Sequence, residues 1–306
     1  MSSSGMTKKR RTTLLNCYTA TLSAYFSLLK PRVMSLVVFT GFVGLYLAPG
    51  SISFSKACLA ILCIAIGSGA AGALNMWYER DSDALMERTK GRALPQELIP
   101  PHHALIFALT LAIGSVMAMG WGVNEVAAFY LAMAILFYVI IYTMWLKPRT
   151  PQNIVIGGAA GALPPVIGWA AVMHETALLP WILFGIIFLW TPPHFWALAL
   201  NRQEEYRTAG IPMLPVVAGI ETTRHKIFVY LIALILLTFL PVYEGDLGFF
   251  YGLTAGVLGV TFLVLGIRMK HSQDPKDNLR FFTFSILYLF LLFTAMGVDR
   301  ALAYVF

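Results

Sequence analysis

Long apolar runs are the feature that most constrains the fold of this chain. Nine of them reach or approach the roughly 20 residues that a helix needs to cross a bilayer. Backbone groups in the hydrocarbon region must be hydrogen-bonded within the protein, which favours helices. Only 12% of the residues are charged, against about 25% in soluble domains. We therefore predict an all-α, polytopic membrane bundle. Its nine transmembrane helices are expected at 33–49, 57–78, 104–121, 126–146, 152–173, 178–200, 226–242, 247–267 and 281–299.

The distribution of basic residues predicts the orientation of this bundle. All of the 22 Lys and Arg except Lys56 and Arg300 fall in the N-terminal segment or in the loops after even-numbered spans. Such loops remain in the cytoplasm, so we expect a cytoplasmic N-terminus. The net charge of +7 then reflects topology, and no nucleic-acid partner is expected. The cell inner (cytoplasmic) membrane is favoured. The mitochondrial inner membrane is the alternative, because a basic, acid-free start also resembles a transit peptide.

The first 32 residues form a segment of their own. Apolar side chains recur there on one helical stripe, which predicts an interfacial helix lying on the membrane before the first span. The stripe consists of Leu14, Leu15, Tyr18, Leu22, Tyr25, Phe26 and Leu29. We therefore divide the chain into a cytoplasmic N-terminal segment (1–32) and a membrane domain (33–306).

Polar residues at intervals of four close the second span. If the helix continues, Asn75, Glu79 and Asp83 form a ladder along one face. Like charges at this spacing repel, and a divalent cation would remove that cost. Carboxylate and amide oxygens suit Mg²⁺, which typically takes one or two carboxylates plus substrate phosphates. Basic residues that suit diphosphate oxygens follow at once: Arg88, Lys90 and Arg92. The alternative is a solvated helix end of mixed charge.

A second polar segment closes the sixth span. Asn201 and Glu205 repeat the spacing of amide and acid, but Ala209 stands where a third polar residue would follow. His194 lies seven residues before Asn201, two turns away on the same face. This pattern indicates a degenerate internal duplication whose two half-sites face each other and hold Mg²⁺ between them. A packing role remains the alternative for His194.

At these residues the chain resembles the membrane prenyltransferases related to 4-hydroxybenzoate polyprenyltransferase. The segment from Asn75 to Asp83 is similar to their first aspartate-rich motif, and the narrower similarity is to the subgroup that farnesylates haem B. Glu79 stands where Asp is commoner, Ala93 where Pro is usual, and the second aspartate motif is not intact. Further matching stretches are Lys30-Pro-Arg32, Thr150-Pro-Gln-Asn153, Gly161-Ala-Leu-Pro164-Pro165, Trp190-Thr-Pro-Pro-His194 and Gly210-Ile-Pro212-Met-Leu214-Pro215.

The resemblance implies a fold, a reaction and a set of roles. The fold is a nine-helix bundle with a central cavity open to the cytoplasmic side. Haem B, farnesyl diphosphate and water would give haem O and diphosphate, with haem A synthase as a downstream partner. Mg²⁺ would be the cofactor, held by the catalytic residues Asn75, Glu79 and Asp83, and His194 would contact haem. The second half-site would add Asn201 and Glu205, and the diphosphate would be bound by Arg88, Lys90, Arg92, Lys147 and Arg202.

Three other functions remain open at this point. A prenyltransferase with another acceptor, such as a quinone precursor, is the nearest, although such relatives usually carry Asp at both positions of the second motif. A transporter is more distant, because its half-repeats surround a polar midplane, whereas the ionisable residues here collect near one membrane surface. A structural membrane subunit would leave the ladder of Asn75, Glu79 and Asp83 without a purpose.

Overall fold

The computed structural model describes residues 22–303, and all regular structure within them is helical. Eight helices or helix pairs are long and apolar enough to span a membrane, and a ninth is obtained when the helical turns Leu22–Leu28 are counted with α2. The predicted all-α membrane bundle is confirmed. The elements are α2 (Pro31–Leu47), α3 (Phe54–Tyr78), α4 (Arg80–Asp83), α5 (Pro101–Gly122), α6 (Glu125–Leu136), the π-helix η1 (Phe137–Leu146), α7 (Asn153–Ala162), α8 (Pro164–Met173), α9 (Leu178–Leu200), α10 (Gln203–Thr208), α11 (Leu214–Ala218), α12 (Ile220–Thr238), α13 (Leu240–Tyr243), α14 (Phe249–His271) and α15 (Pro275–Leu302).

Each predicted span coincides with one helix or one pair of helices, but several helices extend beyond the apolar run. α12 begins at Ile220 and α15 at Pro275, six residues before their predicted starts of 226 and 281. Their first turns carry charged residues, which lowers the local hydropathy without ending the helix. Long charged side chains reach water from such positions. Hydropathy therefore located the apolar segment of each helix and missed its polar first turns.

Proline divides two of the spans. The fifth is split into α7 and α8 at Pro164, and the seventh into α12 and α13 just before Pro241. Proline has no N–H to donate and its ring displaces the preceding turn, so the helix restarts there. The fourth span changes from α6 to the π-helix η1. Turns of π-helix are rare and frequently occur at functional sites.

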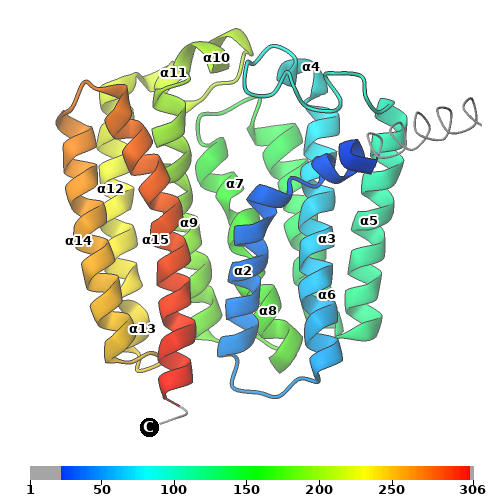
Figure 1. Ribbon diagram of the computed structural model, residues 1–306, viewed down its shortest axis with the longest axis vertical. Helices are drawn as coiled ribbons and strands as arrows, with labels where there is room; N and C mark the ends of the chain where they lie inside the picture. The colour runs from blue at the N-terminus through cyan, green and yellow to red at the C-terminus, as the bar shows by residue number, and fades with distance from the viewer. Residues whose placement is uncertain (1–21, 304–306) are drawn as a thin grey trace, which may run out of the picture.

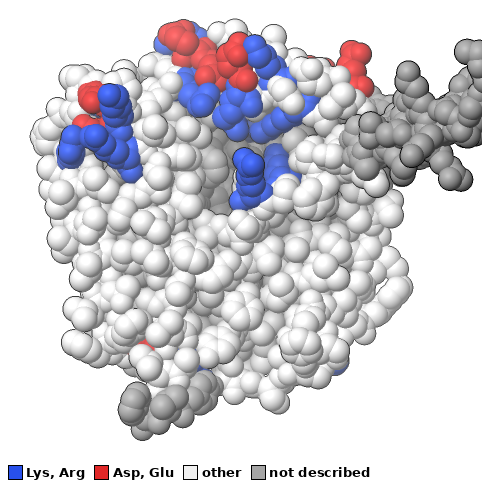
Figure 2. Space-filling view, viewed as in Figure 1, with Lys and Arg blue, Asp and Glu red and all other residues white. Residues whose placement is uncertain are grey.

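The helices form a ring in which α2, α7 and α8 lie between two groups (Figure 1). α3, α5 and α6 pack together on one side, and α9, α12, α14 and α15 on the other. α15 also contacts α2, which closes the ring between the first and last long helices. The short elements α4, α10 and α11 lie at one end of the bundle (Figure 1), which we call the charged end. Lys, Arg, Asp and Glu gather there on the face shown in Figure 2.

The N-terminal segment is described only in part. The turns Leu22–Leu28 are bent by 50° from α2 and run across the bundle rather than along it (Figure 1). This direction suits the interfacial helix expected from the sequence. Residues 14–21 of that helix lie outside the described residues.

Two glycines permit the close crossing of α2 and α8. A Cβ on Gly44 would lie 2.2 Å from the carbonyl oxygen of Pro165, and one on Gly168 would lie 2.0 Å from that of Gly41. Real Cβ atoms do not come so near to other atoms. The two backbones are therefore in contact at these positions, and only glycine, which has no Cβ, fits there. Small residues at such crossings let membrane helices approach one another closely. α2 thereby gains a fixed position against α8, and this position also sets where Lys30 lies.

We expect Gly168→Ala to lower the thermal stability of the protein. The added methyl group must push α8 away from α2, and overpacking of this kind typically costs about 1–3 kcal/mol. The measurement is the apparent midpoint of thermal unfolding in detergent, followed by fluorescence-detected size exclusion. Gly114→Ala on α5 is the matched control, because a Cβ there meets no atom within 4 Å. Equal midpoints for the two variants would contradict the packing argument.

Candidate active site

The first polar segment keeps its helical register to the end. Glu79 closes α3, and the backbone hydrogen bonds continue: Glu79 N donates to Asn75 O (2.9 Å) and Asp83 N to Glu79 O (2.8 Å). The side chains of all three residues are buried. Bonds between residues four apart keep Asn75, Glu79 and Asp83 along one face. The ladder expected from the sequence therefore exists, at the charged end of α3.

The π-helix η1 lies parallel to this ladder and contacts it twice. Asn75 Nδ2 donates to Thr143 Oγ1 (3.1 Å), and one turn further on Lys147 Nζ lies 2.5 Å from the carboxylate of Glu79. The second contact lies four residues after the first in both helices, which shows that the two helices run in the same direction. The backbone N–H of Lys147 bonds to the carbonyl of Tyr142, five residues back, so the wide π turn places Lys147 opposite Glu79.

Two further basic side chains reach the ladder from other parts of the chain. Lys30 Nζ donates to Asn75 Oδ1 (2.8 Å), and Arg92 contacts Asp83 Oδ2 (2.6 Å). With Lys147 on Glu79, each member of the ladder has one cationic partner. Buried carboxylates require such compensation. The ladder is therefore a place where positive charge binds, whether from a side chain or from a metal ion.

Lys30 was not among the candidates chosen from the sequence. It precedes Pro31 at the start of α2 and adopts a left-handed backbone conformation (φ 49°). The signal available in the sequence is the Lys30-Pro-Arg32 stretch, which is similar to the corresponding stretch of the family. A residue 45 positions from Asn75 gives no spacing that links the two. Only the packing of α2 brings Lys30 to the ladder.

Burial and neighbouring charges shift two lysine pKa values in opposite directions. Burial, together with repulsion from Arg92, lowers the pKa of Lys30 to about 7. Burial also opposes the charged form of Lys147, but attraction to Glu79 and their hydrogen bond outweigh it and raise the pKa of Lys147. A lysine that is bound to an amide thus loses its proton more easily than one bound to a carboxylate.

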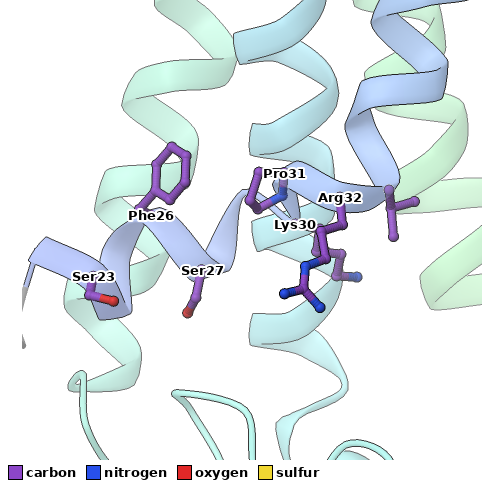
Figure 3. A pocket seen from close by; sticks show the side chains of 7 residues that line it. Ser23, Phe26, Ser27, Lys30, Pro31 and Arg32 are labelled. Carbon is purple, nitrogen blue, oxygen red and sulfur yellow. The ribbon is translucent and has the colours of Figure 1, made fainter.

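A recess opens where the N-terminal turns meet α2. Its volume is about 290 Å³. Figure 2 shows the surface hollowed below the charged end, with basic side chains in view. Figure 3 shows the side chains of Lys30 and Arg32 next to each other at the recess. It is lined by Ser23, Phe26, Ser27, Lys30, Pro31, Arg32 and Val33. Because Lys30 also contacts Asn75, the recess adjoins the ladder.

The predicted basic residues after the ladder separate into two sets. Arg92 joins the ladder at Asp83. Lys90 instead pairs with Glu87 (2.6 Å) on the exposed surface, and Arg88 is exposed as well. Arg92 and Lys147 therefore contact the acids of the ladder, whereas Arg88 and Lys90 lie on the exposed surface nearby, which we call the rim of the site.

The second polar segment does not repeat the ladder. α9 ends at Leu200 and α10 begins only at Gln203, so Asn201 and Glu205 lie on different elements. Asn201 Nδ2 donates to Pro275 O (3.0 Å), and Asn201 Oδ1 accepts from Asn278 (2.7 Å). Asn201 thus joins α9 to α15.

Glu205 retains one unsatisfied atom. Its Oε1 accepts from Arg202 (2.8 Å), whereas Oε2 is buried and has no hydrogen-bond partner. An unpaired buried carboxylate oxygen is costly. Glu205 therefore keeps a free position for a cation.

The imidazole of His194 is fixed on every side but one. Its ring stacks between Trp190 (centroids 4.3 Å apart) and Phe282 (4.5 Å), and Phe195 meets its edge. Nδ1 lies 2.6 Å from Ser285 Oγ. The side chain is buried, with 8% of its surface exposed. The alternative of a purely packing histidine explains the stacking but leaves Nε2 without a partner among residues 22–303.

The donor set of the ladder fits Mg²⁺ when substrate phosphate completes it. Within residues 22–303 no group of three or more His, Cys, Asp or Glu side chains lies close enough to hold a metal ion alone. The ladder offers two carboxylates and one amide. Mg²⁺ prefers oxygen ligands and is commonly bound by one or two carboxylates together with phosphates. The site is therefore suited to a metal that arrives with a phosphorylated substrate.

These features define a polytopic membrane protein with a buried acid and amide cluster at one end. Comparison with known proteins then assigns the family. The model of the UbiA prenyltransferase family matches residues 37–294, and the chain belongs to that family. It is a prenyltransferase.

Two curated relatives illustrate the similarity in sequence. Protoheme IX farnesyltransferase of Granulibacter bethesdensis is 52% identical over 290 residues, which cover 92% of each chain. Protoheme IX farnesyltransferase of Rhodopseudomonas palustris strain BisB5 is 54% identical over 284 residues, which cover 92% of this chain and 91% of the relative. The similarity therefore extends over nearly the whole length of both proteins.

Solved structures share the fold at low sequence identity. A digeranylgeranylglyceryl phosphate synthase superposes with a TM-score of 0.76 at 17% identity, covering 91% of this chain and 98% of that one. A UbiA homolog from Archaeoglobus fulgidus, bound to DMAPP and Mg²⁺, gives a TM-score of 0.63 at 17% identity, covering 90% and 99%. The fold of this chain is thus shared with these distantly related proteins.

Proposed function

We propose that this protein transfers a farnesyl group from farnesyl diphosphate to a vinyl group of haem B, with addition of water, to give haem O and diphosphate. The observation that carries the proposal is the identity of 52–54% to protoheme IX farnesyltransferases over more than nine-tenths of the chain. The buried ladder of Asn75, Glu79 and Asp83 supports it, since a diphosphate leaving group needs a place for positive charge.

The ladder is proposed to hold Mg²⁺ through Asn75, Glu79 and Asp83. Bound there, the metal would stabilise the negative charge that develops on the departing diphosphate. Lys147 and Arg92 neutralise the acids in this structure and lie beside them. They are placed to donate to diphosphate oxygens, and Lys30 is placed to do the same from α2. Arg88 and Lys90 would act at the rim, where they attract the anionic substrate.

The second segment contributes less in this proposal. Glu205 Oε2 is the free acceptor for a second cation, and Arg202 beside it would bind diphosphate. Asn201 is retained as a ligand only if it releases Asn278 and Pro275. The second half-site would thus depend chiefly on Glu205.

The acceptor is proposed to lie among the aromatic side chains around His194. An apolar site that excludes water protects the allylic cation until the vinyl carbon attacks. Trp190, Phe195 and Phe282 surround His194 on three sides. Their surfaces suit a flat macrocycle and a prenyl chain.

The cellular setting follows from the charge distribution. We propose that the charged end faces the cytoplasm and that the protein lies in the cell inner membrane, because loops rich in Lys and Arg stay on the cytoplasmic side. The product would pass to haem A synthase, an enzyme that takes haem O as substrate.

The function is tested by supplying haem B and farnesyl diphosphate, with Mg²⁺, to the purified protein in lipid nanodiscs. We expect a haem product whose mass has increased by one farnesyl group and one hydroxyl group, because the added water loses a proton. A parallel reaction with a quinone precursor in place of haem B tests the other acceptor. Prenylation of the quinone precursor without any haem product would overturn the proposal.

A further inference from the structure

His194 carries a lone pair that no residue in the described part of the chain uses. Ser285 Oγ lies 2.6 Å from the carbonyl oxygen of Phe282, to which it must donate, because a carbonyl can only accept. A hydroxyl has one proton to give. Towards His194, Ser285 therefore accepts, and the proton of the imidazole lies on Nδ1. In the neutral ring Nε2 is then the unprotonated nitrogen.

Nε2 keeps some accessible surface. It makes no hydrogen bond within residues 22–303, yet it is not among the unpartnered polar atoms that are sealed from solvent. The remainder of the ring is covered, since Trp190 and Phe282 stack on its two faces. The imidazole thus presents a single atom, and that atom is a lone-pair donor.

Ser285 is fixed as firmly as the ring that it contacts. Its carbonyl oxygen accepts from Trp190 Nε1 (2.7 Å), and its hydroxyl bonds to Phe282 O. Ser285 is fully buried. One serine therefore joins α15 to α9 through Trp190 and through His194 itself. Metal-binding histidines almost always have such an arrangement, in which the other ring nitrogen donates to a fixed acceptor.

The surroundings favour metal binding over proton transfer. The partner of Nδ1 is a neutral hydroxyl, and no carboxylate lies against this ring among the described residues. A protonated His194 would be a buried cation between two aromatic faces with no anion to compensate it, which is costly. The neutral form is the one that binds iron.

We propose that Nε2 of His194 binds the iron of the haem substrate, and that Ser285 is the positioning residue that fixes the ring for this purpose. The inference rests on the proposed function, because haem B is the acceptor in that reaction. His194 lies seven residues, or about 10 Å of helix, below the charged end of α9. A haem bound there would place its apolar ring next to Trp190 and Phe282, and its carboxylates would point towards the charged end.

The test is spectroscopic and uses the full-length protein without farnesyl diphosphate. Purified protein in nanodiscs is titrated with ferric haem, and the Soret band and electron paramagnetic resonance spectrum are recorded. We expect a histidine-ligated signal for the unmodified protein. In His194→Gly the signal should be lost and haem should bind at least about tenfold more weakly. Added imidazole should restore the signal by filling the vacated space.

Ser285 is tested by two substitutions. Ser285→Ala removes the acceptor and should weaken haem binding by about tenfold, the lower range for outer partners of a metal ligand. Ser285→Thr keeps the hydroxyl and should retain the histidine signal. His102→Ala, an exposed histidine on α5, is the matched control and should change nothing.

The outcomes separate this inference from the proposed function. Absence of a histidine-ligated signal in the unmodified protein overturns the inference even if haem O is formed, and it needs no variant to fold. An unchanged signal in His194→Gly without imidazole overturns it as well. A histidine signal that is lost in His194→Gly and restored by imidazole supports the inference, including in a protein that makes no haem O, where only the proposed function fails.

Discussion

Asp83→Ala is expected to lower the rate of farnesyl transfer by about two to three orders of magnitude, the usual effect of removing a group that stabilises charge in the transition state. Asp83 is buried at the end of the ladder and contacts Arg92 at 2.6 Å. Its loss removes one of two carboxylates proposed to hold Mg²⁺. The measurement is the initial rate of haem O formation by the purified variant.

Folding must be separated from catalysis in this variant. Removing Asp83 leaves Arg92 without its partner, and an uncompensated charge destabilises a protein when it is buried. Asp83→Asn keeps the shape and one oxygen, so it should fold normally and still lose activity. Glu87→Ala is the matched control, since Glu87 is an exposed acid that pairs only with Lys90 on the surface. Near-normal rates in folded Asp83→Ala would remove Asp83 from the metal site.

Treatment with EDTA is expected to abolish activity, and excess Mg²⁺ to restore it. The ladder by itself cannot stabilise a departing diphosphate. Its carboxylates repel the negative charge, and its neutral amide does not compensate that charge. Lys30, Lys147 and Arg92 are bound to the ladder in this structure, so they become free for substrate when a metal takes their place. The measurement is haem O formation before chelation, after it, and after Mg²⁺ is added back.

The chelation experiment has its own control. EDTA saturated with Mg²⁺ beforehand should leave the rate unchanged, which separates metal removal from any effect of the chelator on the membrane protein. Size exclusion before and after treatment reports whether the bundle stays intact. Full turnover in excess EDTA would exclude the metal-dependent mechanism and would assign the leaving-group role to the three basic side chains alone.

Much of the site could be predicted because its spacing is local. Asn75, Glu79 and Asp83 lie at intervals of four, and a helix converts that interval into a common face. Arg92 lies nine residues from Asp83, near enough to be named as a candidate. The assignment of function needed more than spacing, because an acid ladder alone also fits a solvated helix end.

The second half-site shows where local spacing fails. Asn201 and Glu205 have the same interval as Asn75 and Glu79, but α9 ends between them and the backbone turns at Arg202 (φ −132°). An interval of four residues then no longer places Asn201 and Glu205 on a common helical face. Asn201 instead forms hydrogen bonds with Pro275 and Asn278 of α15. These partners are more than 70 residues away, so no local spacing predicts them.

The sequence by itself determined where the apolar helices lie, the end of the bundle where charge collects and the ladder on α3, because hydrophobic length, positive loops and helical periodicity are local properties of a chain. Only the tertiary structure decided which cation meets each member of the ladder and which nitrogen of His194 is free. Lys30, Lys147 and Ser285 reach their partners across 45, 68 and 91 residues. Those contacts depend on how α2, η1 and α15 pack, and packing is set by the shapes of all the helices together.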